Sequence, residues 1–365
     1  MEVMKISKRK ISVSECKEQD IIAENIVNKN GIMMVAENTV VNEKIKRKLI
    51  ELQVADVIVI RENESWEETA RNSDPLLEAD FSKFKEKYVK RTRNVKKILD
   101  NLAEGYTVTG ETINYIVESF YEDIMKNRRI IEYICRMENM DQQTYSHSIN
   151  VSIYSMMIGK WMGLPGIQIR DLMKAGMLHD IGKLKISKEL LEKTSSLSPE
   201  DLEEFKKHPV YGYEIAKNIP DLHTHITQAI LMHHEREDGS GYPIGLKGDK
   251  INTFSKIISM ADLYDNMIFE GNNTMNTPFD VIRKIERMGF GYFDIKVSMA
   301  FLSNISNCYI GAKVRLSNGD IGEISGIIPT NISNPIVKVG DKSISTADGK
   351  ISIVEILGKE VSLAQ

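Results

Sequence analysis

Residues 172–183 read Leu-Met-Lys-Ala-Gly-Met-Leu-His-Asp-Ile-Gly-Lys, and this stretch decides the fold. Its apolar residues have helical spacing up to Leu178, so a helix is predicted to end at His179-Asp180. The same arrangement recurs where His233-His234 ends an apolar run and where Asp262 follows another. A carboxylate beside an apolar helical face is costly to bury unless a partner compensates its charge. A shared metal ion would remove that conflict at all three places.

Histidines supply the remaining candidate ligands. Neutral imidazole binds divalent transition metals well, and carboxylates complete such sites. A single histidine on an apolar face is most often a core residue. Five histidines and two carboxylates within about 120 residues favour one common site instead. The candidate metal ligands are His147, His179, Asp180, His208, His233, His234 and Asp262.

Outward from this stretch, helical periodicity extends from Glu111 to about Ile305. The predicted fold class is therefore mainly α, an all-helical domain with a small α+β module before it and a small β-rich, barrel-like tail after it. The predicted boundaries are 1–65 for the module, 66–119 for a linker and charged helices, 120–305 for the helical domain and 306–365 for the tail.

Shorter elements are predicted on both sides of the helical domain. In the module, 20–27 and 32–35 are expected to form a hairpin around Asn30-Gly31, because Asn-Gly favours tight turns. A helix is expected at 43–52, a strand at 55–60, a linker at 65–73 and a charged helix at 80–103, which we consider as a dimer stalk. In the tail, strands are expected at 312–316, 321–328, 335–339 and 351–356.

Composition excludes several classes of protein. The chain has 365 residues, of which 42% are hydrophobic and 27% charged, and this excludes a mostly disordered chain. A net charge of -4 gives no global positive field for nucleic acid or an anionic membrane. Three dispersed cysteines (Cys16, Cys135 and Cys308) argue against a disulfide framework or a thiolate zinc site. Without an apolar signal region or a long apolar run, a soluble cytoplasmic protein is expected.

The motifs resemble a known family. The string 179–183, with His147 upstream and Asp262 downstream, resembles the HD phosphohydrolase superfamily. His208-Pro209 and the string 233–243, which ends in Gly241-Tyr242-Pro243, narrow the resemblance to the HD-GYP family of bacterial cyclic di-GMP phosphodiesterases. The resemblance covers about residues 120–305, and the stretch 291–294 resembles the segment that closes this domain.

The resemblance implies a site and a reaction. Asp180 would bridge two iron or manganese ions, one of them shared with His147, His179 and Asp262, the other with His208, His233 and His234. A hydroxide between the ions would attack phosphorus and release linear pGpG or GMP. Lys183 would place a cation near a phosphate oxygen, and Asp265 would support a ligand or contact the substrate. The substrate region, also a docking surface for diguanylate cyclase domains, would include Asp238, Gly239, Gly241, Tyr242 and Pro243.

Two positions depart from the family pattern. Gln143 stands where some members carry a glutamate for a third metal, so two metals are expected here. Near Gly271, after Glu270, the family usually has a substrate-contacting arginine. Loss of the guanidinium group of this arginine could weaken substrate binding by on the order of 1–3 kcal/mol. Two alternatives therefore stay open: a catalytically weak receptor or scaffold for a cyclic dinucleotide, and a hydrolase that acts on another nucleotide.

His223 and His225 fall outside the family pattern. They are expected to be exposed side chains ahead of a helix.

Overall fold

A computed structural model describes residues 6–16, 20–23, 26–27, 33–35, 39, 41, 43–51, 54, 56–62, 75–126, 130–136, 143–191, 193, 197–269, 277–289 and 291–359. The chain divides into two units, Met1–Glu78 and Ala79–Gln365. The domain boundaries predicted at 65, 119 and 305 stay predictions.

The first unit is a small α+β module. Strands β1 (Ile6–Ser12), β5 (Asp56–Glu62) and β2 (Ile21–Ile22) form an antiparallel sheet in that order, and β3 (Ile26–Val27) pairs with β4 (Met33–Val35). A 3-10 turn, η1 (Val13–Glu15), and helix α1 (Glu43–Glu51) complete it. The predicted helix and last strand are confirmed. The predicted hairpin is confirmed only for the pairing of 26–27 with 33–35, because Ile21–Ile22 forms a separate strand that pairs with β5. The turn at Asn30-Gly31 and the linker at 65–73 lie outside the described residues.

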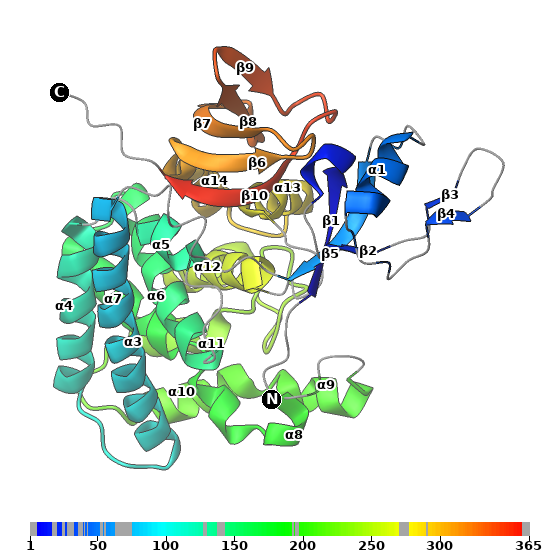
Figure 1. Cartoon of the computed structure of the whole chain (residues 1–365). Helices are drawn as coiled ribbons and strands as arrows, with labels where there is room; N and C mark the ends of the chain where they lie inside the picture. Colours follow the sequence, from blue (N-terminus) through cyan, green and yellow to red (C-terminus); the bar gives the residue numbers. More distant parts are fainter. Residues whose placement is uncertain are drawn as a thin grey trace. The chain divides into compact units, whose positions relative to one another are not determined.

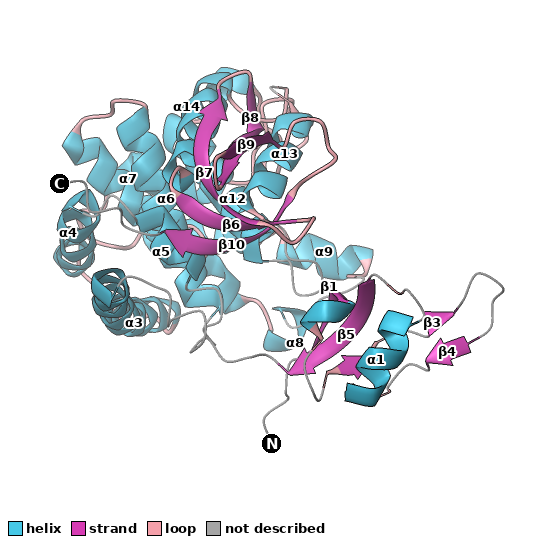
Figure 2. Ribbon diagram, turned by 45° about the horizontal axis from the view of Figure 1, so that its top comes forward, coloured by secondary structure: helices cyan, strands magenta, loops and turns pink. Residues whose placement is uncertain are grey.

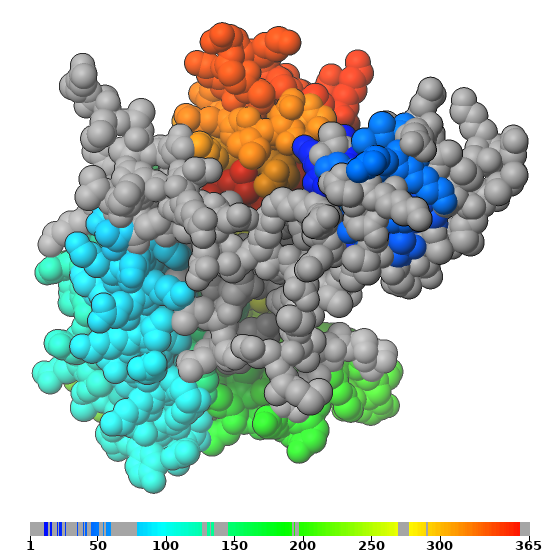
Figure 3. Space-filling view, in the orientation of Figure 1, coloured from blue at the N-terminus to red at the C-terminus, as the bar shows by residue number. Residues whose placement is uncertain are grey.

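The second unit is mainly helical, as predicted (Figure 1). Its helices and 3-10 turns are α3 (Pro75–Ala103, which begins in the first unit), α4 (Gly110–Lys126), α5 (Ile130–Arg136), α6 (Gln143–Trp161), α7 (Gly166–Leu178), η2 (Ile181–Lys185), α8 (Lys188–Leu191), α9 (Pro199–Phe205), α10 (His208–Ala216), α11 (Thr224–Met232), η3 (Gly248–Lys250), α12 (Thr253–Phe269), α13 (Pro278–Met288), α14 (Ile295–Ile305) and η4 (Ser306–Tyr309). The predicted charged helix corresponds to α3, whose side chains form an outer surface of this unit (cyan in Figure 3). Among the described residues, no helix is both long enough and apolar enough to cross a bilayer.

Helix α6 lies at the centre of the helical core. It packs against α7, α12 and α14. Ile149, Val151, Ile153, Tyr154 and Met156 are all buried, although they point in different directions around the helix. A helix that is apolar all round is one that the protein surrounds. This position brings His147, near the start of α6, into the interior.

The tail is a five-stranded antiparallel sheet (Figure 2). Its order is β10 (Ile353–Lys359), β6 (Ala312–Leu316), β7 (Ile321–Ile328), β8 (Asn331–Val339) and β9 (Lys342–Ser345). Alternate residues of β6, namely Ala312, Val314 and Leu316, are buried in the same apolar core as the helices. The predicted strands are confirmed, but β9 was not predicted. The barrel-like closure is wrong for the described strands, because β10 and β9 lie at opposite edges of an open sheet.

Packing between α12 and α14 supports a first prediction. Phe301 is fully buried, and its ring centroid lies 5.0 Å from that of Tyr264. We expect Phe301→Ala to lower the free energy of unfolding by about 3–5 kcal/mol, because it removes buried apolar area and leaves a cavity. Met299→Ala on the same helix is the control: this side chain is 57% exposed, and its loss should change stability by less than about 0.5 kcal/mol. Urea unfolding measures both, and equal effects would contradict the packing described.

Candidate metal centre

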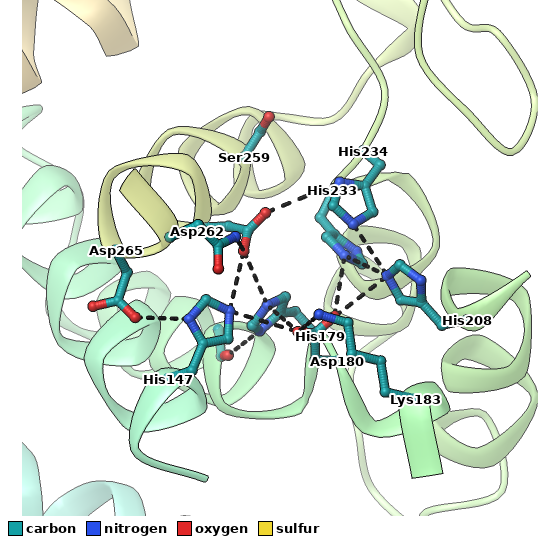
Figure 4. A network of polar contacts seen from close by, with 12 residues as sticks. His147, His179, Asp180, Lys183, His208, His233, His234, Ser259, Asp262 and Asp265 are labelled. Atoms are coloured by element: carbon teal, nitrogen blue, oxygen red, sulfur yellow. Dashed lines mark hydrogen bonds and ion pairs between the residues drawn. The ribbon is translucent and has the colours of Figure 1, made fainter. Parts of the chain in front are cut away.

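The seven predicted ligands meet in one place, and five of them lie at or beside helix ends (Figure 4). His179-Asp180 follow α7, His233-His234 follow α11, and His208 begins α10. Because a helix end is where the chain leaves the apolar core, these five positions place polar side chains at a common meeting point without interrupting the packed faces. The other two ligands, His147 in α6 and Asp262 in α12, lie within helices.

Asp180 lies between two groups of ligands. Its Oδ2 atom is 3.3 Å from His179 Nε2 and 3.5 Å from His147 Nε2. Its Oδ1 atom is 3.3 Å from His208 Nε2 and 3.8 Å from His233 Nε2. Asp262 belongs to the first group, with Oδ1 3.1 Å from His147 Nε2. One carboxylate therefore faces both groups, a different oxygen toward each.

Backbone carbonyls orient three of the imidazole rings. Nδ1 of His179, His208 and His233 lies 2.8, 2.9 and 2.7 Å from the carbonyl oxygens of Gly176, Phe205 and Ile230. A carbonyl oxygen only accepts hydrogen bonds, so each Nδ1 carries a proton, and Nε2 is the atom whose lone pair each ring presents to the centre when the ring is neutral. This tautomer is the one in which histidine binds metal through Nε2.

The Nε2 atoms of three histidines lie so close together that their lone pairs would repel one another if the rings were neutral and no cation were bound. His208 Nε2 is 3.3 Å from His233 Nε2 and 3.1 Å from His234 Nε2. Within the described residues, the buried atoms His147 Nε2, His179 Nε2 and Asp180 Oδ1 make no hydrogen bond. Buried polar atoms without partners are costly, and a cation among them would satisfy all of them together. The donor set thus fits divalent metal.

Burial and charge set the protonation of these groups. Burial lowers the pKa of His208 to about 4 and lowers the pKa of His233 and His234 well below its ordinary value, so these rings are neutral. Burial would raise the pKa of Asp180, but the neighbouring His179 and Lys183 outweigh it and hold the pKa well below its usual range. The centre therefore presents a carboxylate anion at Asp180 and uncharged rings at His208, His233 and His234, the forms that bind metal. At His179 and His147 burial would lower the pKa, but the carboxylates of Asp180 and Asp262 outweigh it and raise the pKa above its ordinary value, so a metal ion would displace a proton there.

Comparison with known proteins agrees with this geometry. Residues 124–297 match the family model of the HD domain. The chain contains an HD domain. The resemblance to HD-GYP proteins in its motifs is also confirmed.

Two relatives and one solved structure show how far the similarity extends. A cyclic di-GMP phosphodiesterase of Pseudomonas aeruginosa is 27% identical over 226 residues, which are 61% of this chain and 54% of the relative. Cyclic di-GMP phosphodiesterase PdeB of Borreliella burgdorferi is 32% identical over 193 residues, 52% of this chain and 50% of the relative. An HDG"Y"P protein from Bdellovibrio bacteriovorus shares the fold, with a TM-score of 0.51 and 20% identity over 81% of this chain and 98% of that one. The chain thus spans about half the length of the curated relatives it matches.

Lys183 contacts the HD centre, the group of seven candidate ligands, from a 3-10 turn. Helix α7 ends at Leu178, and the chain tightens into η2, so Lys183 does not lie on a continuation of α7. The Lys183 ammonium donates to Asp180 Oδ2 at 2.5 Å. Lys183 is therefore paired with the central carboxylate.

Gly182 allows this part of the HD domain to close. A Cβ atom built on Gly182 would lie 1.9 Å from the carbonyl oxygen of His208 and 2.5 Å from the backbone nitrogen of Gly212. Only glycine permits backbone contact this close. The glycine of the His-Asp-Ile-Gly-Lys string thus brings α10, and with it His208, against Asp180.

The loop at 235–243 is organised by a carboxylate that the sequence argument missed. Glu235 is buried and accepts hydrogen bonds from the backbone N–H groups of Ile244, Gly245 and Leu246 at 2.8, 3.1 and 2.8 Å. Gly241 packs on the loop start, where a Cβ atom would lie 2.5 Å from Glu235 Cα. Glu235 directly follows the His233-His234 pair, and this position could have indicated its role. A charged residue in a loop is usually solvated, however, so burial was not expected.

Of the predicted substrate-region residues, Tyr242 contacts a candidate metal ligand, whereas Asp238 is exposed on the loop. Tyr242 stacks on His234, with centroids 4.6 Å apart, and Pro243 follows it, partly exposed. Asp238 is exposed, and its carboxylate accepts from Ser240 N and Oγ, closing its own turn with Gly239. The closing stretch also contacts the loop, because the Arg236 guanidinium lies 5.0 Å from the ring centroid of Tyr292.

Asp265 positions His147. Its Oδ2 atom is 2.7 Å from His147 Nδ1, and the side chain is 1% exposed. Three residues further along α6, Asn150 accepts a hydrogen bond of 2.6 Å from the Tyr88 hydroxyl on α3. A helix outside the matched family region thus contacts the core next to a candidate ligand.

Two predicted departures cannot be placed. The Gln143 side chain and residues 270–276, including Glu270 and Gly271, lie outside the described residues.

Gly182→Ala should disrupt the HD centre. The added methyl group forces η2 and α10 apart, and overpacking of about 1–3 kcal/mol corresponds to roughly 5–150-fold weaker Mn²⁺ binding. Gly326→Ala is the control, since a Cβ there meets no atom within 4 Å. Competition with a fluorescent chelator measures the affinity. Unchanged Mn²⁺ binding in Gly182→Ala would contradict the role given to this glycine.

Asp265→Ala should weaken metal binding about 10–100-fold, because it frees the His147 ring from its orienting carboxylate. Asp265→Asn keeps an acceptor for Nδ1–H and should retain most of the affinity. The same chelator competition distinguishes them. Identical affinities in Asp265→Ala and the wild type would show that His147 is oriented by other contacts.

Proposed function

We propose that this chain is a metal-dependent phosphodiesterase that hydrolyses cyclic di-GMP to linear pGpG or GMP. The observation that carries the proposal is the position of Asp180, whose two oxygens face two separate groups of histidines. The names of the curated relatives support the substrate class.

Two divalent ions, iron or manganese, are proposed for the centre. His147, His179 and Asp262 would hold one, and His208, His233 and His234 the other, with Asp180 shared between them. When bound, such ions supply Lewis-acid activation of water and stabilise charge on a phosphoryl group. Neutral imidazole and carboxylate ligands suit either metal.

The chain's own residues would bind and orient the phosphodiester. Lys183 brings an ammonium group beside Asp180, where a phosphate oxygen would approach. Burial would lower the pKa of Lys183, but Asp180 and Asp262 raise it above its ordinary value, so the group stays a cation. Tyr242 and Pro243 lie beside His234 and would form the adjoining wall for the nucleotide.

The reaction adds one water across a phosphodiester bond. The water oxygen bonds to phosphorus, the bond from phosphorus to one ribose oxygen breaks, and that oxygen receives the proton. Asp180 stays ionised throughout, because its low pKa makes it a poor proton carrier near neutral pH.

The finer assignments are part of the same proposal. The exposed part of the 238–243 loop is the proposed docking surface for a diguanylate cyclase domain, and α3 the proposed surface for a second copy of the chain. A reducing cytoplasm is the proposed compartment, in keeping with Cys16 and Cys308, which form no disulfide within the described part of the chain.

Replacement of Lys183 tests the proposed role in turnover. Lys183→Gln should lower the rate of cyclic di-GMP hydrolysis about 10²–10³-fold, because it removes the ammonium group proposed to contact a phosphate oxygen. Lys185→Gln is the matched control: this lysine, two residues further on, donates to the Ala103 carbonyl oxygen instead of Asp180. Chromatography of nucleotides after incubation with Mn²⁺- or Fe²⁺-loaded protein gives both rates.

The same assay separates the two alternatives from the proposal. Asp180→Asn gives the background, because it removes the shared carboxylate. Binding of cyclic di-GMP without product above that background would make the chain a receptor. Faster hydrolysis of a competing nucleotide in one mixture would make it a hydrolase of a different specificity.

A further inference from the structure

A second group of metal-binding side chains lies outside the HD centre, where α7 and α11 begin. Asp171 lies in α7, His223 directly precedes α11, and His225 lies in the first turn of α11. Asp171 Oδ2 is 2.7 Å from His223 Nδ1 and 3.0 Å from His225 Nε2. The sequence argument expected both histidines to be exposed side chains ahead of a helix. Their exposure is confirmed, although His225 lies inside the helix, and both converge on one buried oxygen.

This cluster is separate from the HD centre, although the same helices supply both. Asp180 lies nine residues after Asp171, and His233 lies eight residues after His225. At 1.5 Å per residue, the two groups are about 12–14 Å apart along the helices. Contacts at both ends show that α7 and α11 lie side by side and run in the same direction.

The donor chemistry is that of a transition-metal site. Two imidazole nitrogens and one carboxylate oxygen are a ligand set typical of Zn²⁺ sites that keep a fourth, open position. Bonds of about 2.0–2.1 Å at tetrahedral angles separate neighbouring ligand atoms by roughly 3.3 Å. The separations of 2.7 and 3.0 Å therefore need only small movements to admit an ion.

Accessibility and rigidity are suited to such a site. The His223 and His225 side chains are 58% and 44% exposed, whereas the Asp171 side chain is only 3% exposed. An ion can therefore reach the histidines from solvent while the carboxylate is held in place. The His225 ring also packs edge-on against Phe254, with centroids 5.0 Å apart, which fixes its direction.

A purely structural explanation accounts for only part of this arrangement. The Lys174 ammonium lies 2.8 Å from Asp171 Oδ1 and neutralises the buried carboxylate by itself. Lys174 uses Oδ1, so both histidines share the other oxygen. Neutralising the Asp171 carboxylate does not require the two imidazoles that contact Oδ2. Two imidazole nitrogens beside one carboxylate oxygen are instead the arrangement that can bind one cation.

We propose that Asp171, His223 and His225 form a second divalent-metal site, suited to Zn²⁺, which ties the start of α7 to the start of α11. An ion there would brace the two helices whose other ends carry His179-Asp180 and His233-His234. The proposal does not depend on the nucleotide that the HD centre takes, so it stands or fails separately from the proposed phosphodiesterase activity.

Zinc stoichiometry of the full chain tests the proposal. Equilibrium dialysis against Zn²⁺, followed by elemental analysis, should show one ion fewer per chain in His225→Gln and in Asp171→Asn than in the wild type. Lys174→Met is the matched control on the same carboxylate, and it should keep the additional ion because all three ligands remain. Equal zinc content in the wild type and His225→Gln would overturn the proposal.

A second measurement guards against a folding defect. Without metal, His225→Gln should melt at the temperature of the wild type, since the residue is half-exposed. With Zn²⁺, the melting temperature of the wild type should rise further than that of His225→Gln. A crystal soaked with Zn²⁺ should show an anomalous peak between Asp171, His223 and His225, and a peak in the HD centre alone would overturn the assignment.

Discussion

The buried carboxylate of Asp180 is the constraint on which the rest of the HD domain depends. An ionised group that is 3% exposed is tolerated only when its neighbours compensate its charge. Lys183 donates to Asp180 and supplies part of this compensation. Oδ2 and Oδ1 face two separate groups of imidazoles, and a cation held between the carboxylate and their Nε2 atoms would supply the rest. The imidazoles in turn are held by backbone carbonyls at the ends of their own helices. The helix ends must therefore meet at Asp180, and the packing of α6, α7, α10, α11 and α12 follows from that requirement.

Close backbone contact is the second condition for this convergence. Gly182 lets η2 lie against the start of α10, and Gly241 lets the loop return onto Glu235. The Glu235 carboxylate accepts hydrogen bonds from three backbone N–H groups. These bonds hold the Gly-Tyr-Pro loop beside His234, and none of them involves a candidate metal ligand. The loop and the centre are thus built from different side chains of one short segment, so a change in the loop need not displace an imidazole.

The sequence predicts the seven ligands because two strings and three isolated positions stand in a characteristic order, and several of the ligands end or follow an apolar run. It does not predict the contact of Lys183 with Asp180, since that depends on the change from α7 to the tighter η2, which leaves the apolar pattern intact. Strand β9 is missed because Lys-Ser-Ile-Ser contains a single apolar residue and lies at a sheet edge. The cluster at Asp171 is missed because His223 and His225 are 52 and 54 residues away from it in the chain, and only the pairing of α7 with α11 brings them together.

The charges and lone pairs of the HD centre make the stability of the folded domain depend on metal binding. Nε2 of His208 and of His233 lie 3.3 Å apart while each Nδ1–H is committed to a carbonyl, so two lone pairs face each other in a dry interior. Protonation would relieve this repulsion in water, but burial lowers the pKa of both rings and so opposes it. A divalent ion relieves it without adding a proton, because it accepts both lone pairs at once. The ligand arrangement that makes the apo centre unfavourable is therefore the same arrangement that makes metal binding contribute directly to the stability of the folded domain.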